Sequence, residues 1–359
     1  MIKIAKLKVT VAFLLIVSII FSGCSMQLSF EDSDTDTEIE QTDTEDENKS
    51  ARQSRVSIIQ YIDYSSLNEC CEGIKSSLDS AGIGYDVTVC NYETATEECE
   101  KLARNIEING LRDLIVVIGT PCAETVCPIV NTAGKTPVVF CAVTDPVGAG
   151  IVKNLKTPEL KCTGTATAFN IKEQLNMINT FQPYITRLGV IYTSSEQNTK
   201  EQLKSLKKAA KELNITVFDV EVQSPSELTP KAKELMRKVE AVVILPDNMV
   251  SKNSWNLTER SIVEKVPLYG VNISQVEEGC VAGYCYDFKA LGEKAGEQAV
   301  EILHGDNPSE MPVIMERECT LYVNKDRLKE LDMEIPEEYK PIAHEVTTKY
   351  ESKSLNGKQ

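Results

Sequence analysis

The feature that most constrains the fold of this 359-residue chain is a regular alternation of short apolar runs with longer amphipathic segments. Runs of strand length separated by helix-length segments predict crossover units, in which parallel strands form sheets covered by helices. The predicted strands are residues 56–60, 86–91, 114–119, 137–142, 187–192, 216–221, 241–245 and 267–271. The predicted helices include residues 67–81, 96–109, 171–181, 199–214 and 228–238.

The alternation runs through two successive series, one before about residue 168 and one after it. The roughly 300 residues from Arg55 onward are too many for one typical core and fit two lobes of about 100–200 residues each. Gly164, Thr165 and Thr167 mark the expected first crossing between the lobes. The predicted fold is therefore α/β, with two doubly wound parallel-sheet lobes.

Polar residues gather where the predicted strands end, which is the side on which open α/β sheets place their ligand crevices. Hydroxyls near helix starts favour an anion, because free backbone N–H groups lie there, whereas carboxylates such as Asp145, Asp247 and Asp287 favour an ammonium group. That combination suits a zwitterion. Helix capping is the alternative explanation for each residue taken alone. The strand-end candidates are Gln60, Tyr61, Thr120, Pro121, Thr144, Asp145, Ser194, Ser195, Asp247 and Asn248.

The N-terminus resembles a bacterial lipoprotein signal. Lys3, Lys6 and Lys8 precede an apolar run over residues 9–21, which is too short for a comfortable transmembrane helix, and Phe-Ser-Gly-Cys follows it. We expect residues 1–23 to be removed and Cys24 to carry acyl chains that anchor the protein at the outer face of the cell membrane. A plain secretory signal with a chance cysteine is the alternative.

Residues 24–54 are expected to form a solvated tether, because residues 31–48 hold ten acidic residues and no basic one. Without the three signal lysines and the ten tether acids, the net charge of −16 becomes about −9 for residues 49–359, and this mildly acidic body argues against nucleic acid as a partner. The two histidines, His304 and His344, lie away from strand ends, and no nucleophile elbow, phosphate loop or metal triad occurs, so we expect neither catalysis nor a cofactor or metal. Eleven cysteines besides Cys24 show no zinc spacing, and a Cys280–Cys285 disulfide stays an alternative.

Several stretches resemble the substrate-binding proteins of ABC transporters, in particular the tryptophan- and tyrosine-transporter type. The resemblance covers most of residues 55–333, and its most specific piece is AVTDPVGAG with the lysine and leucine that follow it. Other matching stretches are VSIIQYIDYSSLNECCEGIKSSL, LIVVIGTPCAETV, RLGVIYTSSEQNT, VEAVVILPDNMV and LYVNKDRLKEL. The resemblance implies a periplasmic-binding-protein type 1 fold, in which a three-strand hinge joins the lobes and lets them close on a ligand.

On that fold, residues 55–168 and 285–319 would form the N-terminal lobe, and residues 169–284 and 320–340 the C-terminal lobe, with 341–359 a polar tail. The family's cleft maps onto the strand-end candidates other than Tyr61, together with Asp287 at the second crossing. This chain has Pro246 where the family commonly has threonine, and Tyr286 where it has isoleucine, so the identity of the ligand stays open. Tyr61 and Tyr286 are candidate stacking surfaces.

The resemblance implies a membrane-anchored receptor that delivers a small polar ligand, an amino acid with an aromatic side chain being preferred, to ABC permease and ATPase subunits. The alternatives are a sensory receptor of the same fold that does not transport its ligand, and a binding protein for a sugar or a nucleoside.

Overall fold

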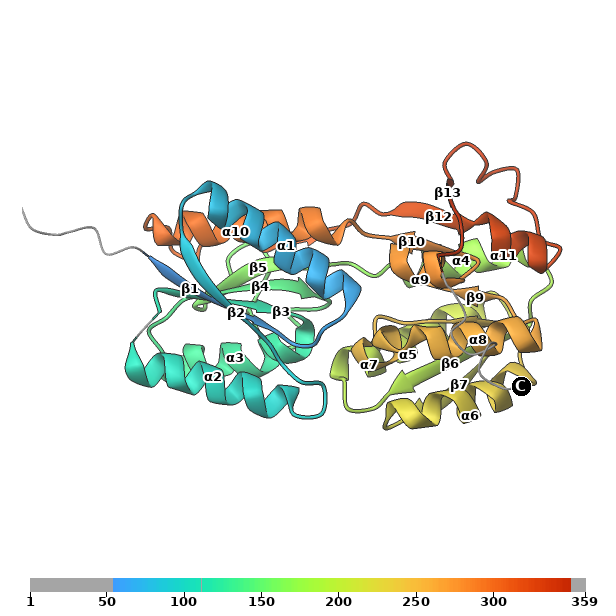
Figure 1. Ribbon diagram of the computed structural model, residues 1–359, viewed down its shortest axis with the longest axis horizontal. Helices are drawn as coiled ribbons and strands as arrows, with labels where there is room; N and C mark the ends of the chain where they lie inside the picture. Colours follow the sequence, from blue (N-terminus) through green and yellow to red (C-terminus); the bar gives the residue numbers. More distant parts are fainter. Residues whose placement is uncertain (1–53, 111, 350–359) are drawn as a thin grey trace, which may run out of the picture. The chain divides into compact units, whose positions relative to one another are not determined.

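The computed structural model describes residues 54–110 and 112–349 (Figure 1). The predicted signal peptide, Cys24, the acidic tether and residues 350–359 lie outside the described residues. No helix within the described part of the chain is both long enough and apolar enough to cross a membrane. The eleven cysteines from Cys70 onward are free thiols, Cys280 and Cys285 included.

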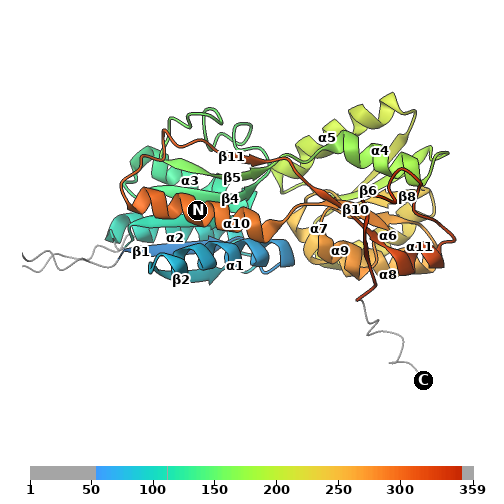
Figure 2. The same ribbon diagram turned by 90° about the horizontal axis from the view of Figure 1, so that it is seen from above.

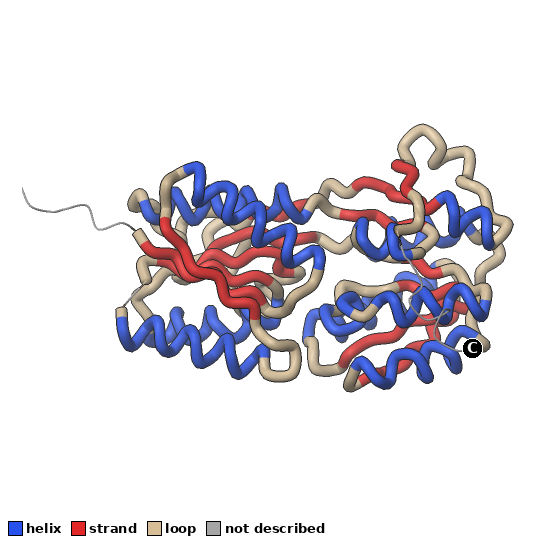
Figure 3. Tube along the Cα trace, viewed as in Figure 1, coloured by secondary structure: helices blue, strands red, loops and turns tan. Residues whose placement is uncertain are grey.

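The first lobe is built on a six-stranded sheet with the strand order β11-β5-β4-β3-β1-β2, and its neighbouring strands are parallel. Its central strands are apolar on both faces: every residue of β3, with the sequence LIVVI, is buried. Helices α1 and α10 cover one face, and α2 and α3 cover the other (Figures 1 and 3). The elements are β1 Arg55–Gln60, α1 Ser65–Ser80, β2 Gly84–Val89, α2 Ala95–Asn109, β3 Leu114–Ile118, α3 Thr120–Ala133, β4 Val138–Val143, β5 Cys162–Thr167, α10 Phe288–Leu303 and β11 Ile314–Glu316.

The second lobe is built on a seven-stranded sheet with the order β13-β12-β10-β9-β8-β6-β7. Only the β10–β12 pair is antiparallel among its described strands. Helices α4 and α5 lie on one face, and α6 and α8 on the other (Figure 2). The elements are α4 Ile171–Phe181, β6 Arg187–Thr193, α5 Gln197–Glu212, β7 Thr216–Val222, α6 Pro225–Met236, β8 Ala241–Val243, α7 Asn248–Lys252, α8 Ser254–Glu264, β9 Leu268–Tyr269, α9 Ile273–Glu278, β10 Ala282–Cys285, β12 Thr320–Asn324, α11 Lys325–Glu330 and β13 His344–Val346.

The chain passes between the two lobes three times. It leaves the first sheet after β5, returns through residues 286–287 between β10 and α10, and leaves again through residues 317–319 between β11 and β12. Both sheets share the order 2-1-3-4-5 in their first five strands, so each has a switch point between its first and third strands where a ligand crevice is expected. The two-lobed, mostly parallel α/β architecture agrees with the sequence prediction.

Two local differences from the expected elements have physical reasons. Residues 344–346, which we placed in a polar tail, form β13 and pair with β12, so a mostly polar segment serves as an edge strand. The strand β5, with the sequence CTGTAT, is fully buried, although it lacks the apolar run that identifies a buried strand in the sequence. Its backbone pairs with β4 and β11 on its two sides, and the Thr163 hydroxyl donates a hydrogen bond to the Met311 backbone oxygen at 2.9 Å.

The close contact between α1 and α10 depends on glycine. A Cβ atom on Gly73 would lie 2.1 Å from the backbone oxygen of Lys289, and one on Gly292 would lie 2.1 Å from the backbone oxygen of Cys70. Each clash is with backbone of the opposite helix, so neither can be relieved by a side-chain rotation. The packing matters for the site because α1 begins one residue after Tyr64 and α10 begins with Phe288.

Candidate functional site

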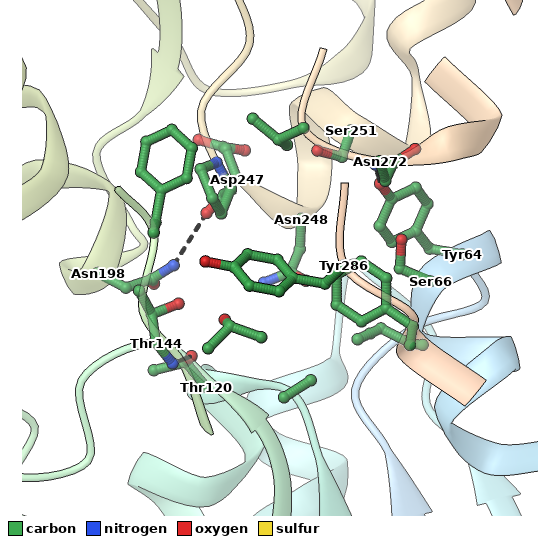
Figure 4. A pocket seen from close by; sticks show the side chains of 17 residues that line it. Tyr64, Ser66, Thr120, Thr144, Asn198, Asp247, Asn248, Ser251, Asn272 and Tyr286 are labelled. Carbon is green, nitrogen blue, oxygen red and sulfur yellow. Dashed lines mark hydrogen bonds between the residues drawn. The ribbon is translucent and has the colours of Figure 1, made fainter. Parts of the chain in front are cut away.

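A pocket lies at the carboxyl ends of the strands of both sheets, with about 610 Å³ of empty space that includes open solvent (Figure 4). Its walls come from both lobes and from two of the three crossings. Figure 4 shows the Tyr286 side chain in the middle of the pocket, between the threonines of the first lobe and Asp247 of the second. The lining residues are Tyr64, Ser66, Leu67, Thr120, Ala142, Thr144, Thr167, Phe169, Asn198, Pro246, Asp247, Asn248, Ser251, Val271, Asn272, Tyr286 and Phe288.

Four aromatic side chains contribute to the apolar part of the pocket. Phe169 follows the first crossing, and Tyr286 and Phe288 flank the second, with their ring centroids 6.4 Å apart in an edge-to-face arrangement. The Tyr286 hydroxyl donates a hydrogen bond to the backbone oxygen of Ala168, which ties the two crossings together. Tyr64 completes the set from the first lobe. Aromatic walls of this kind stack on a planar apolar group in edge-to-face or offset geometry.

The first lobe contributes hydroxyl groups at its switch point. Thr120 begins α3, and its Oγ1 accepts a hydrogen bond from the Thr144 backbone N–H at 3.2 Å, which holds the ends of β3 and β4 together. The register of β4 shifts between Phe140 and Val143, and Ala142 there has a φ of +58°. Such a bulge redirects the residues that follow it, and here it brings Thr144 into the pocket wall.

Asp247 is the only charged residue among those that line this pocket, and it is 1% exposed. The Thr193 backbone N–H donates to Asp247 Oδ2 at 2.7 Å, while the Thr193 hydroxyl and the Val250 N–H donate to Oδ1 at 3.1 and 2.9 Å. Asp247 therefore caps α7 and lines the pocket at once. Burial raises the pKa of its carboxyl group, and no lysine or arginine is among the residues that line this pocket.

A second buried acid, Glu196, lies behind Asn248. Its carboxylate accepts hydrogen bonds from the Asn248 backbone N–H at 3.1 Å and from Asn248 Nδ2 at 2.8 Å. Burial and then the nearby charge of Asp247 raise the pKa of Glu196. The raised pKa favours the protonated form of Glu196, so the negative charge of this wall lies on Asp247.

Two hydrogen bonds close the gap between the lobes beside the pocket. Asn272 Nδ2 donates to the Tyr64 hydroxyl, and the hydroxyls of Ser65 and Ser274 are 2.6 Å apart. Tyr64 and Ser65 belong to the first lobe, and Asn272 and Ser274 belong to the second. The structure thus holds the lobes in contact at the mouth of the pocket.

Of the residues predicted from the sequence, the structure brings Thr120, Thr144, Asp247 and Asn248 together in the pocket wall. Asp145 lines an adjoining pocket, where its Oδ1 accepts a hydrogen bond from the Gly148 N–H at 2.9 Å.

The other predicted residues do not line this pocket. Gln60 Nε2 donates to the Ile62 oxygen and to Asn68, and Ser194 hydrogen-bonds to Glu221. Asp287 is exposed and accepts a hydrogen bond from the Ala290 N–H, so it serves as the cap of α10. Tyr61 is buried in the first-lobe core, and Pro121 and Ser195 also lie off the pocket.

Sequence reasoning did not single out Tyr64, Phe169, Asn198 or Ser251 as site residues. Tyr64 lies four residues beyond the end of β1, and Asn198 lies in the first turn of α5, so neither sits directly at a strand end. Phe169 carried a signal that could have been used, since it is a large aromatic residue directly after the predicted first crossing, and it both lines the pocket and packs against the second-lobe core.

Comparison with known proteins identifies the family. The family model for ABC transporter substrate-binding proteins matches residues 55–347. The chain therefore belongs to this family and is a substrate-binding protein of an ABC transporter. It is 30% identical over 295 residues to a tyrosine-binding protein of Clostridioides difficile (strain R20291), a match that covers 80% of this chain and 84% of that protein.

Two solved structures share the fold at comparable identity. A Streptococcus pneumonia structure described as the ABC domain in complex with L-Trp has a TM-score of 0.76 at 27% identity, covering 82% of this chain and all of the other. A ligand-free, open substrate-binding protein with adhesive properties from Clostridium difficile has a TM-score of 0.62 at 28% identity, with the same coverage. The solved structures that this chain resembles thus include both a tryptophan complex and an open form.

Proposed function

We propose that this protein captures an aromatic amino acid between its lobes and releases it unchanged to an ABC permease. The observation that carries the proposal is the composition of the pocket: four aromatic side chains surround it, and Asp247 is its only charged lining residue. The aromatic rings stack on the ligand's ring, and the Asp247 carboxylate accepts hydrogen bonds from the ligand's ammonium group. The tyrosine and tryptophan named for two relatives support the same ligand class.

The ligand's carboxylate has partners in the first lobe. Thr120 and Thr144 present hydroxyls to the pocket, and the free backbone N–H groups of the first turn of α3 favour an anion beside them. No lysine or arginine lines the pocket among the described residues. The ligand's carboxylate is therefore bound by neutral hydroxyl and N–H donors and not by a positively charged side chain. A sugar fits less well, because it carries no ammonium group to pair with the buried Asp247 carboxylate.

The contact between the two lobes supports capture of the ligand by lobe closure. The structure resembles the tryptophan complex more than the ligand-free open form, with TM-scores of 0.76 and 0.62. Contacts across the mouth, such as the pair of Ser65 and Ser274, exist only when the lobes meet. A ligand that binds both lobes therefore stabilises the closed state over the open one.

Isothermal titration of the purified protein tests the ligand class. We expect L-tyrosine, L-tryptophan or L-phenylalanine to bind, and aliphatic amino acids, sugars and nucleosides to give no heat. Asp247→Asn should weaken the aromatic amino acid by about 10- to 100-fold, the value of a charge-assisted hydrogen bond. Asp287→Asn is the matched control, since asparagine caps α10 as well and the residue lies outside the pocket. Binding of a sugar with no response to aromatic amino acids would refute the assignment.

We also propose that acyl chains on Cys24 hold the receptor beside its permease at the outer face of the cell membrane. The support is the signal-like segment that precedes Cys24 in the sequence. Metabolic labelling with a palmitate analogue should mark the wild type and not Cys24→Ala, which should leave the membrane fraction and keep its ligand affinity. A labelled or membrane-retained Cys24→Ala protein would contradict this anchor.

A further inference from the structure

A second pocket adjoins the aromatic one. Four residues line both pockets: Thr120, Thr144, Phe169 and Asn198. The empty space of the second pocket, open solvent included, is about 1,100 Å³. The aromatic pocket and its neighbour therefore lie side by side, so a ligand long enough to pass these four residues would reach both. The proposed aromatic amino acid has no group that would fill this additional space.

The second pocket is acidic. Glu124 and Asp145 line it from the first lobe and Glu201 from the second, and no lysine or arginine lines it among the described residues. Glu201 is exposed and lies 3.7 Å from Lys204 Nζ, so its charge is partly balanced at the rim. Glu124 is half-buried, and no hydrogen bond or ion pair to its carboxylate occurs in the described structure; burial raises its pKa.

Gln202 is the second, independent feature of this pocket. Its side chain is 7% exposed and lines the pocket, yet neither its Nε2 nor its Oε1 has a hydrogen-bond partner within the described residues. Asn198, one turn earlier on α5, also lines the pocket and has an unpartnered Oδ1. A buried amide left without partners is costly in a folded protein, so such a group indicates a ligand that supplies the missing partners.

The two features together define the ligand's chemistry. The acids attract a positive charge, whereas the Gln202 amide needs both an acceptor and a donor. A bare cation would satisfy the carboxylates and leave Gln202 Nε2 unpaired. The N-terminus of a peptide offers an ammonium group and, within the reach of one residue of about 3.6 Å, a carbonyl oxygen and an amide N–H.

We infer that the acidic pocket is a second ligand subsite, which binds the ammonium and first peptide group of an aminoacyl extension on the aromatic ligand. The protein then takes short peptides with an aromatic residue in the second position, as well as the free amino acid. This inference rests on the proposed function, because it places the aromatic ring among Tyr64, Phe169, Tyr286 and Phe288. The Gln202 amide meets the peptide group, and Glu124 and Asp145 meet the ammonium.

Titration calorimetry with L-tyrosine, Gly-L-Tyr and N-acetyl-Gly-L-Tyr tests the subsite. In Gly-L-Tyr a peptide N–H replaces the tyrosine ammonium at Asp247, while the new ammonium meets Glu124 and Asp145. We therefore expect Gly-L-Tyr to bind within about tenfold of L-tyrosine, and the acetylated peptide, which lacks the ammonium, to bind about tenfold or more weakly than Gly-L-Tyr. Glu124→Gln and Gln202→Leu should each weaken Gly-L-Tyr by about tenfold and leave L-tyrosine within about twofold. Glu212→Gln is the control, since it makes the same charge change at the far, exposed end of α5.

The outcomes separate the two proposals. If L-tyrosine binds and Gly-L-Tyr does not, the second subsite is refuted and the proposed function stands. If Gly-L-Tyr binds equally well to the wild type, Glu124→Gln and Gln202→Leu, its extension lies elsewhere and the subsite is again refuted. If neither aromatic amino acids nor the peptide bind, both proposals fall. Glu124 and Gln202 lie in different lobes, so a folding defect in one variant leaves the other as a test.

Discussion

Replacing Gly292 by alanine should destabilise the first lobe by overpacking its α1–α10 contact. The added Cβ would lie 2.1 Å from the Cys70 backbone oxygen, more than 1 Å short of ordinary contact, and neither atom belongs to a movable side chain. Overpacking of this kind costs about 1–3 kcal/mol, whereas the gain in helix propensity from glycine to alanine is at most about 1 kcal/mol. We therefore expect the clash to outweigh the gain, with a fall in melting temperature of about 2–8 °C.

Circular dichroism melts of Gly292→Ala and Ser76→Ala measure the effect. Ser76 is exposed on α1, so its replacement changes helix propensity and adds no atom to the interface. The same spreading of the helices should weaken ligand binding, because α1 and α10 begin beside Tyr64 and at Phe288 in the pocket wall. A Gly292→Ala protein that melts at or above the wild-type temperature would show that the two helices are not held at this distance.

Three further outcomes are expected. Ser274→Ala removes the hydrogen bond to Ser65 across the mouth, so calorimetry should show ligand affinity reduced by about two- to tenfold, and unchanged affinity would exclude this contact from closure. Burial raises the pKa of Glu196 above its ordinary 4.5, so the native state holds its proton more tightly than the unfolded chain. The stability that this proton provides is complete below pH 4.5 and is lost as the pH rises through the folded-state pKa of Glu196. Melting temperatures measured against pH should therefore fall over this range in the wild type and fall less steeply in Glu196→Gln. Equal slopes for the two proteins would contradict this role of Glu196. Iodoacetamide should label the native protein first at Cys319, which is half-buried and has a thiol pKa raised to about 11. The ten buried cysteines should react only after denaturation. Labelling of a buried cysteine in the native protein, detected by mass spectrometry, would refute its burial.

The architecture was predictable because its signals are local. Strands such as β3 are apolar on both faces, and the helices between strands carry amphipathic periods, so the element order follows from pattern alone. Strands without such a pattern were harder to predict. Strand β5 is buried but composed of small and hydroxyl residues, and β13 is mostly polar and gains its place only by pairing with β12.

The site was less predictable than the fold because strand ends hold two kinds of polar residue that look alike in sequence. Asp247 and Asp287 both follow a strand and both cap a helix, but only Asp247 also faces the pocket. Which of them does so depends on how the two sheets are placed, and no local pattern encodes that. Residues such as Tyr64 and Gln202 reach the ligand spaces from within a loop or a helix, so a search confined to strand ends passes over them.

The three crossings also constrain the order in which the chain can fold as it emerges. Strand β5 is complete by Thr167, but its neighbour β11 and the covering helix α10 follow only after most of the second lobe, from Phe288 onward. Until then one face of the first sheet lacks α10, and β5 presents an unpaired edge to other chains. The first half of this protein is therefore an incomplete folding unit, and a fragment ending near residue 168 should aggregate, whereas a chain that extends past Glu316 can complete the first sheet.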